Sequence, residues 1–289
     1  MATVDVRQVV TDKIINLLEK GGNVYREEWL KSAQGGFPFN AKTNIKYNGV
    51  NVLLLWNAAL EKNYQSNAWL TYKQAADMDA QVRKGEKGTM CVYFEMVKKK
   101  GTVENIDETG FYPMCKSFYV FNADQIDGLN LVKSDAIITP EFSPNEQAEQ
   151  ILSASAAIIK HGGESAFYSP SHDMINLPAK NRFFNESSYY ATALHELTHW
   201  TGHQSRLNRN FGKRFGSESY AFEELVAELG AAFVVGAIGF IDATIENHAA
   251  YLESWLKVLK NDKTAIFTAC KQASLAYEFI FNNTVNSPA

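Results

Sequence analysis

The sequence predicts a mixed α+β protein built from two domains, and three observations lead to this class. The chain has 289 residues, which exceeds one ordinary domain of about 100 to 200 residues. Hydrophobic residues make up 46% and aromatic residues 12%, which is enough for two cores and excludes a disordered or fibrous chain. Helical and strand-like segments mix in the first half, whereas the chain is mostly helical beyond residue 185. We therefore expect a mixed α+β domain at 1–128, a linker at 129–143 and a mostly helical domain at 144–289.

The first half is expected to begin with a helix and to end with two strands. Between Val6 and Leu18, apolar residues recur at steps of three and four, and Gly21 and Gly22 then stop the helix. Further elements are expected as helices at 49–60 and 71–82 and as strands at 89–97 and 116–121. A long charged hairpin loop is expected to join the two strands.

The second half opens with the clearest helix start in the chain. Ser143 can cap the helix, Pro144 fits its first position, and Glu146 completes a capping box. This helix is expected to continue to Gly162. Beyond it we expect a strand pair at 165–168 and 174–177, then helices at about 188–201 and 220–233.

The chain shows no signal for a membrane or for export. The longest apolar stretch, 225–240, is interrupted by Glu228 and three glycines, so it does not read as a membrane span. Charged residues interrupt the apolar pattern of the first 18 residues, unlike a secretion signal. The cysteines Cys91, Cys115 and Cys270 fit neither a disulfide framework nor a paired metal motif. We expect a cytoplasmic protein with reduced thiols and no membrane partner.

The charge pattern limits how the protein could bind DNA. A net charge of −4 argues against a protein whose whole surface grips a duplex. Residues 1–127 hold 16 basic and 15 acidic side chains, whereas the remainder holds 12 and 17. Any polyanion is therefore expected to bind the first half.

The segment His195-Glu196-Leu197-Thr198-His199 is the most informative motif. On a helix, His195 and His199 lie one turn apart on one face, so both rings can reach one ion. The HExxH pattern is typical of zinc hydrolases; two histidines without a metal are the alternative. The extended metzincin pattern needs a histidine at position 205, where this chain has Ser205, so that class is excluded. His203 is interpreted as a polar residue at the end of the helix.

A third metal ligand is expected from the second helix. Glu224 and Glu228 share one face, and two carboxylates directed into a helix contact are costly without a cation. We assign Glu224 as the third ligand and Glu228 as the acceptor that orients a ligand histidine through its other ring nitrogen. The two roles could be exchanged, and a solvated acidic face is the alternative for Glu224. Glu223 is expected to face solvent.

Such a centre predicts peptide hydrolysis. Glu196, beside His195 but not a ligand, is placed to take a proton from a metal-bound water and to deliver it to the leaving amine. Tyr220 and His248 are candidates to stabilise the developing oxyanion, with a purely structural role as the alternative for each. We expect Zn²⁺ as the cofactor, with Mn²⁺ or another divalent ion as the alternative.

The chain resembles the ArdC antirestriction proteins in both halves. In the second half the matching strings are HELTHWTGH at 195–203, RLNR at 206–209, FEELVAELGAAF at 222–233 and ENHAAYL at 246–252. In the first half they are NGVN at 48–51, WLTYKQA at 69–75, RKGEKG at 83–88 and VFN at 120–122. The resemblance implies an N-terminal domain for single-stranded DNA and a C-terminal zincin-like, gluzincin-type metallopeptidase domain. It further implies a protein of a conjugative plasmid or other mobile element that shields incoming DNA from restriction.

One cluster in the first half combines aromatic rings with cations, as single-strand binding requires. Its candidate residues are Trp69, Tyr72, Lys73, Gln74, Arg83, Lys84 and Lys87, joined by Trp29, Tyr47 and Asn51. For each aromatic taken alone, burial in the core is the favoured interpretation, and Trp56 is expected to be core; only the cluster as a whole indicates DNA binding.

The sequence leaves three functions to compare. The first is antirestriction through binding of single-stranded DNA, coupled to metal-dependent peptidase chemistry on an unknown protein or peptide. The second is a DNA-dependent protease that acts on proteins bound to or crosslinked on DNA. The third is a DNA-binding protein whose metal is purely structural. The oligomeric state stays open.

Overall fold

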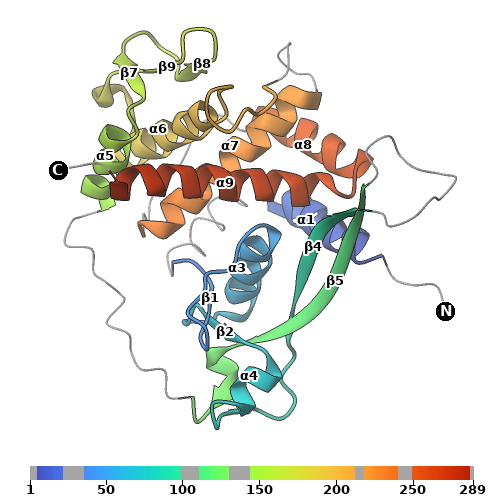
Figure 1. Cartoon of the computed structure of the whole chain (residues 1–289). Helices are drawn as coiled ribbons and strands as arrows, with labels where there is room; N and C mark the ends of the chain where they lie inside the picture. The colour runs from blue at the N-terminus through green and yellow to red at the C-terminus, as the bar shows by residue number, and fades with distance from the viewer. Residues whose placement is uncertain are drawn as a thin grey trace, which may run out of the picture.

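The computed structural model describes residues 5–21, 36–98, 111–129, 144–211, 218–239 and 249–286. Helix α9 (Ala265–Asn286) crosses the middle of the molecule. The strands of the first half lie on one side of it, and the small sheet of the second half lies on the other with α6, while α7 passes behind α9 (Figure 1). The expected mixed α+β class is confirmed.

The first half is built on a four-stranded sheet. Its elements are α1 (Val6–Gly21), β1 (Phe39–Asn40), α3 (Val50–Lys62), β2 (Ala68–Leu70), α4 (Tyr72–Ala76), β3 (Gln81–Val82), β4 (Thr89–Lys98), β5 (Phe111–Asn122) and β6 (Ile126–Asp127). The strand order is β1-β2-β5-β4, and β3 pairs with β6 separately. The two expected strands are confirmed as the antiparallel pair β4–β5, in which Cys91 lies opposite Phe118.

Helix α3 packs its apolar side against this sheet. Gly49 precedes it with a φ of 58°, a conformation that glycine adopts freely, and Asn63 ends it in the left-handed region. Leu55 of α3 meets Trp69 of β2 and Cys91 of β4 in one buried cluster. Trp56, expected in the core, is buried.

The helix expected at 71–82 is wrong in its second half. Thr71 and Gln74 form a capping box that starts α4, but the helix ends at Ala76. Asp79 takes a left-handed φ of 56°, and Val82 then pairs with Ile126. Burial of Val82 against Ile126 in a small cluster outweighs the helical spacing of the local sequence.

The second half combines a small sheet with long helices. Its elements are α5 (Pro144–Ala154), β7 (Ile158–His161), β8 (Phe167–Ser169), β9 (Met174–Leu177), α6 (Glu186–Thr201), α7 (Glu218–Ala237), α8 (Ala249–Asn261) and α9. The expected strand pair is confirmed as β8–β9, and β7 adds a parallel strand on the other side of β9. The helices expected at about 188–201 and 220–233 are confirmed as α6 and α7.

Helix α5 is shorter than expected. The hydroxyl of Ser155 donates to the carbonyl of Leu152, and Ala156 takes a left-handed φ of 60°. The β-branched residues Ile158 and Ile159 then pair with β9. The continuation to Gly162 is therefore wrong, and the capping residue Ser143 lies outside the described residues.

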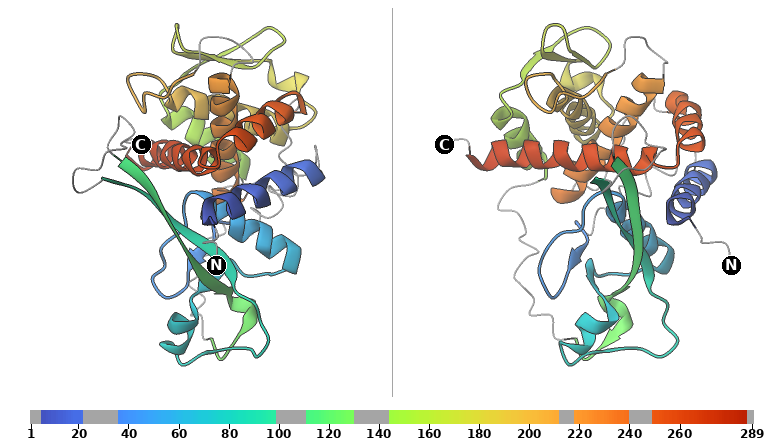
Figure 2. Two further views of the ribbon diagram at one scale, coloured as in Figure 1. Left: turned by 90° about the vertical axis from the view of Figure 1, so that its right-hand side faces the viewer. Right: turned by 45° about the vertical axis from the view of Figure 1, so that its right-hand side comes forward.

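One hydrophobic cluster, here called the shared core, joins the two halves. It contains Val10 and Ile14 of α1, Leu53 of α3, Phe233 of α7 and Ile266 of α9. Figure 2 shows α1 lying against α8, although the two helices stand at opposite ends of the sequence. The linker expected at 129–143 falls almost wholly outside the described residues, so the domain boundary stays a prediction.

Phe37 is partly buried at the centre of this junction. Its ring packs edge-on against Trp56 and Phe233 and stacks on Tyr277, with centroids 5.0 Å apart in the last pair. At the edge of the junction, Lys263 donates to the carboxylate of Asp5 at 2.7 Å. Aromatic packing and an ion pair thus hold the N-terminal elements to the C-terminal helices.

The three cysteines are free thiols, with Cys91 and Cys115 in β4 and β5 and Cys270 in α9. Within the described ranges, every helix is too short or too polar to cross a lipid bilayer.

Candidate metal centre

Helices α6 and α7 together supply the residues of the HExxH site. The side chain of Asn185 caps α6 by accepting from the N–H of Ser188 at 2.7 Å, and Gly202 follows its last residue. His195 and His199 lie one turn apart on α6, as the spacing predicts, and both are buried. Glu224 of α7, also buried, faces them.

The donor atoms of these three residues lie at the spacing of a metal site. Glu224 Oε2 lies 3.6 Å from His195 Nε2, and Glu224 Oε1 lies 3.5 Å from His199 Nε2. All three residues can place one ligand atom within 4.8 Å of the others. In a tetrahedral site with bonds of about 2.0 to 2.1 Å, neighbouring donor atoms lie about 3.3 to 3.4 Å apart. The two imidazoles and the Glu224 carboxylate, with one ligand atom of each within 4.8 Å of the others, could hold one divalent cation.

The other nitrogen of each ring faces a second carboxylate. His195 Nδ1 lies 3.5 Å from Glu228 Oε2, and His199 Nδ1 lies 3.2 Å from Glu223 Oε1. This arrangement fixes the direction of each ring and leaves Nε2 turned toward Glu224. Glu228 therefore lies where an orienting carboxylate should lie, on the side of the imidazole away from Glu224.

Glu223 is the residue that sequence reasoning missed. It was expected to face solvent, but only 2% of it is exposed, so that expectation is wrong. Arg209 neutralises it with three N–H contacts of 2.8 to 3.2 Å and also donates to the carbonyl of Thr198 and the hydroxyl of Thr201. A Cβ on Gly202 would lie 2.8 Å from this guanidinium. The glycine after the helix thus leaves room for the arginine that supports Glu223.

The charge balance of the centre favours a cation. Burial alone would lower the pKa of His199, but Glu223 and Glu224 outweigh it and raise that pKa to about 10. Burial would also raise the pKa of Glu224, but His195 and His199 lower it far more. Protons and a divalent cation therefore compete for the same nitrogens.

Glu196 lies beside the three candidate ligands, and its electrostatic environment differs from theirs. Burial raises its pKa, and the two histidines partly oppose this effect. Strand β8, which carries Tyr168, packs against α6. The β8–β9 turn is attached to the end of α6, since Arg206 binds Asp173 and lies over the ring of Trp200 at 3.9 Å. A strand edge is thus held next to Glu196.

Helices α6 and α7 approach each other closely at Gly230. A Cβ on this residue would lie 2.5 Å from Cγ2 of Thr198, the residue before His199. Ala227 and Ala231 on the same helix are fully buried. Small residues on α7 therefore set the spacing between the histidines and Glu224.

Of the two oxyanion candidates, Tyr220 lies among the described residues. Tyr220 lies half-buried in the first turn of α7, one turn before Glu224. His248 lies outside the described residues. Both assignments stay predictions.

Several DNA candidates of the first half serve the fold instead. Trp69 is 1% exposed, so its ring has no open face for a base, and the expectation that it stacks on DNA is corrected. Asn51 uses its amide to bind the N–H and carbonyl of Val92. Gln74 belongs to the capping box of α4. Burial raises the pKa of Tyr47 to about 12, and Trp29 lies outside the described residues.

The remaining candidates lie together near one turn. Arg83 is held by ion pairs to Glu86 at 3.1 Å and to Asp127 at 3.3 Å. The other exposed candidates are Tyr72, Lys73, Lys84 and Lys87.

Comparison with known proteins matches each half to a known domain. Residues 4–121 match the N-terminal domain of anti-restriction factor ArdC, and residues 146–272 match a zincin-like metallopeptidase domain. The antirestriction ArdC protein from plasmid R388 is similar in structure over 99% of this chain and all of its own. Its metal-free structure gives 37% identity with a TM-score of 0.79, and its Mn(II)-bound structure gives 38% with 0.78.

Curated sequences show the same likeness. Two proteins named DNA primase TraC from Escherichia coli are 37% and 38% identical over 94% of this chain. The chain spans only 20% and 26% of their lengths. The uncharacterized protein y4eC of Sinorhizobium fredii is 35% identical, with 93% of this chain and 89% of that protein covered.

Proposed function

The chain belongs to the ArdC family of antirestriction proteins, and from this premise we propose that it protects the DNA of a mobile element from restriction. It does so by binding single-stranded DNA with its N-terminal half and by using a divalent-metal centre of peptidase type in its C-terminal half. The observation that carries the second part is the spacing of His195, His199 and Glu224 about one point between two helices.

Zn²⁺ is the proposed ion. Two imidazole nitrogens and one carboxylate oxygen are the donor set of catalytic zinc sites that keep one position open. Mn²⁺ is the alternative, because one structure of the R388 ArdC protein is Mn(II)-bound. When bound at such a site, a divalent cation lowers the pKa of a water molecule toward about 7 and polarises a carbonyl group.

The residues of the chain then divide the work of peptide hydrolysis. Glu196 accepts the proton of the attacking water and passes it to the leaving amine, and its raised pKa suits both steps. Glu223 and Glu228 hold the two imidazoles in position through their Nδ1 atoms. Tyr220 and His248 are the proposed donors to the oxyanion.

A second candidate function is a protease that acts on proteins bound to DNA. Glu196 favours a catalytic over a structural metal, because a purely structural site has no use for a buried carboxylate next to its ligands. A DNA-binding protein with a structural metal is the third candidate.

Glu196→Gln separates these functions, since it keeps every metal ligand and removes the base. The exposed Glu253→Gln in α8 is the matched control. We expect Glu196→Gln to bind Zn²⁺ and single-stranded DNA like the parent protein but to lose casein cleavage and autolysis, with and without DNA.

The restriction assay decides what the metal centre contributes. Protection of a transferred plasmid that survives in Glu196→Gln shows that antirestriction needs no catalysis. Loss of protection together with DNA-stimulated cleavage favours the protease. A parent protein that binds neither Zn²⁺ nor Mn²⁺, or that leaves the plasmid as sensitive as an empty vector does, would contradict the proposal.

A further inference from the structure

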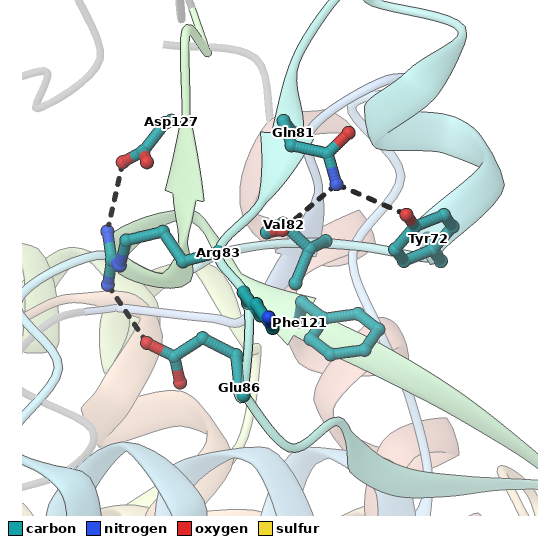
Figure 3. Close-up of a pocket in the computed structure, with 9 residues that line it drawn as sticks. Tyr72, Gln81, Val82, Arg83, Glu86, Phe121 and Asp127 are labelled. Atoms are coloured by element: carbon teal, nitrogen blue, oxygen red, sulfur yellow. Dashed lines mark hydrogen bonds and ion pairs between the residues drawn. The ribbon is translucent and has the colours of Figure 1, made fainter.

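An open pocket of about 490 Å³ lies on the first half, next to the turn that follows β3. Figure 3 shows Tyr72 and Phe121 on one side of it and Arg83 with its acidic partners on the other. We infer that this pocket and the neighbouring rings of Tyr72, Phe121 and Tyr119, here called the aromatic strip, are the place where bases of single-stranded DNA stack. The inference rests on the proposed DNA-binding function and assigns it to a surface.

The aromatic strip consists of two exposed tyrosines and the partly buried Phe121, which packs against the small cluster of Val82 and Ile126. Tyr72 is 56% and Tyr119 57% exposed, and the ring of Phe121 lies 6.3 Å from that of Tyr72. A Cβ on Gly88 would lie 3.1 Å from Cβ of Tyr119 and 3.2 Å from Cζ of Phe121. The backbone of Gly88 therefore lies directly against both residues, which share one face of β5.

The tryptophans of the described residues offer no such surface. The buried set comprises Trp56, Trp69, Trp200 and Trp255. A base stacks on an exposed aromatic face, so the tyrosines and Phe121 are the rings that can serve. Tyr72 is also held in place, because the amide of Gln81 donates to its hydroxyl at 3.1 Å. A ring fixed before binding loses less entropy when a base stacks on it.

Unpaired lysines lie beside the strip, as a phosphate backbone requires. Lys84 lines the pocket itself, Lys73 follows Tyr72, and Lys87 precedes Gly88. All three are exposed, and none forms an ion pair with another residue in the described part of the chain. They leave three positive charges available for phosphates.

Arg83 has a different role from these lysines. It binds Glu86, Asp127 and the carbonyl of Asp124, as Figure 3 shows for the two carboxylates. The guanidinium therefore offsets part of the negative charge of Glu86 and Asp127, and the two acids repel a phosphate less than they would without it. Arg83 holds the turn that carries Lys84, and the lysines contact the strand.

The surface distinguishes single strands from duplexes, because a paired base keeps its faces stacked inside the helix and cannot lie on a tyrosine. Charge alone would not discriminate in this way. An unpaired strand is the occupant that uses both the rings and the lysines.

The test measures binding of a fluorescent oligothymidine of about 15 nucleotides by anisotropy, beside a duplex of equal length. Tyr72→Ala and Tyr119→Ala are each expected to weaken binding of the single strand about 5- to 150-fold, the effect of losing one stacked base. Tyr93→Ala is the matched control, since Tyr93 is 52% exposed on the same hairpin but points to the opposite face of β4–β5 from Tyr119.

Two further variants separate stacking from folding and from charge. Tyr72→Phe removes the bond to Gln81 but keeps the ring, so it should bind nearly as the parent does. The double variant Lys84→Ala/Lys87→Ala should lower the slope of log affinity against log salt by about 1.4, which corresponds to two phosphate contacts. Lys160→Ala, an exposed lysine of β7, should leave this slope unchanged.

The outcomes keep the inference and the function apart. If the parent prefers the single strand but Tyr72→Ala and Tyr119→Ala bind like Tyr93→Ala, the aromatic strip is overturned and the DNA-binding function stands. If the parent binds the duplex as tightly as the single strand at every salt concentration, or binds neither, the proposed DNA binding itself fails.

Discussion

Gly230→Ala is expected to damage the metal centre without touching any ligand. The added methyl group would lie 2.5 Å from Cγ2 of Thr198, where ordinary contacts begin at 3.4 Å. Neither group can move away easily. The added methyl group is fixed to the backbone of α7, and Thr198 is buried with its hydroxyl donating to the carbonyl of Leu194 at 2.8 Å. Helices α6 and α7 must therefore separate locally by about 1 Å.

That separation acts directly on the ligands, since the histidines lie on α6 and Glu224 lies on α7. Metal bonds tolerate errors of about 0.2 Å, so a shift of this size pulls Glu224 out of range or strains the centre. Removing residues that support a metal site lowers its metal affinity about 10- to 100-fold. We expect Gly230→Ala to lower the affinity for Zn²⁺ and Mn²⁺ by at least this factor. Overpacking lowers the free energy of unfolding by about 1 to 3 kcal/mol, and the higher helix propensity of alanine relative to glycine offsets about 1 kcal/mol of this loss.

Calorimetric titration of the metal-free protein measures the affinity, and urea unfolding measures the stability. Gly162→Ala is the control, because a Cβ on Gly162 meets no atom within 4 Å. Adding Thr198→Ser to Gly230→Ala removes the clashing methyl group while keeping the hydroxyl, so it should restore much of the affinity. Parent-like affinity in Gly230→Ala, or no gain in the double variant, would refute the reasoning.

Two further predictions concern buried and interfacial charges. Arg209→Met leaves the carboxylate of Glu223 buried without its cation, so it should lower the free energy of unfolding of the metal-free protein in urea by about 3 to 5 kcal/mol. The double variant Arg209→Met/Glu223→Gln should recover part of this stability. A loss below about 1 kcal/mol for the single variant would contradict the role of the pair. Arg7 and Lys263 hold the pKa of Asp5 well below its usual range. The stability that Asp5 contributes is therefore fully present above its unfolded pKa of about 3.9 and is lost as the pH falls through its folded pKa. The difference in melting temperature between the parent and Asp5→Asn should therefore shrink between about pH 5 and pH 2, and a constant difference would exclude this linkage.

The sequence could predict the centre of the site because its geometry is local. Residues four apart on a helix share a face wherever the helix lies, so the motif places His195 and His199 together before any tertiary contact is known. The pairing of α6 with α7 follows from small residues and acidic pairs on α7. Strands β4 and β5 were likewise visible in their own composition.

The supporting residues could not be found in this way. Helix α7 is buried on nearly all sides. The position of Glu223 around the helix therefore does not show that it meets a histidine rather than solvent. Its partner Arg209 reaches it from a loop 14 residues earlier, and local spacing does not encode that contact. A signal was present only in the resemblance, whose matching strings include both residues.

Aromatic residues show the same limit in the first half. Trp69 and Tyr72 stand three positions apart in one string, yet one is buried in the sheet and the other is open to solvent. Which ring is covered depends on α3 packing over β2, and no periodicity within 69–75 reports this. A contact distant in sequence also explains why α4 is short. Val82 of β3 pairs with Ile126 of β6, 44 residues later, and this pairing prevents the helix from continuing to Val82.

The shared core has a consequence for how this protein spreads. A recombination event that swapped only one half for a distant homologue would leave the rings around Phe37 facing unmatched partners, and such chimaeras should aggregate or be degraded. The N-terminal and C-terminal halves are then expected to be inherited as a single unit, each drifting only as fast as the other can accommodate.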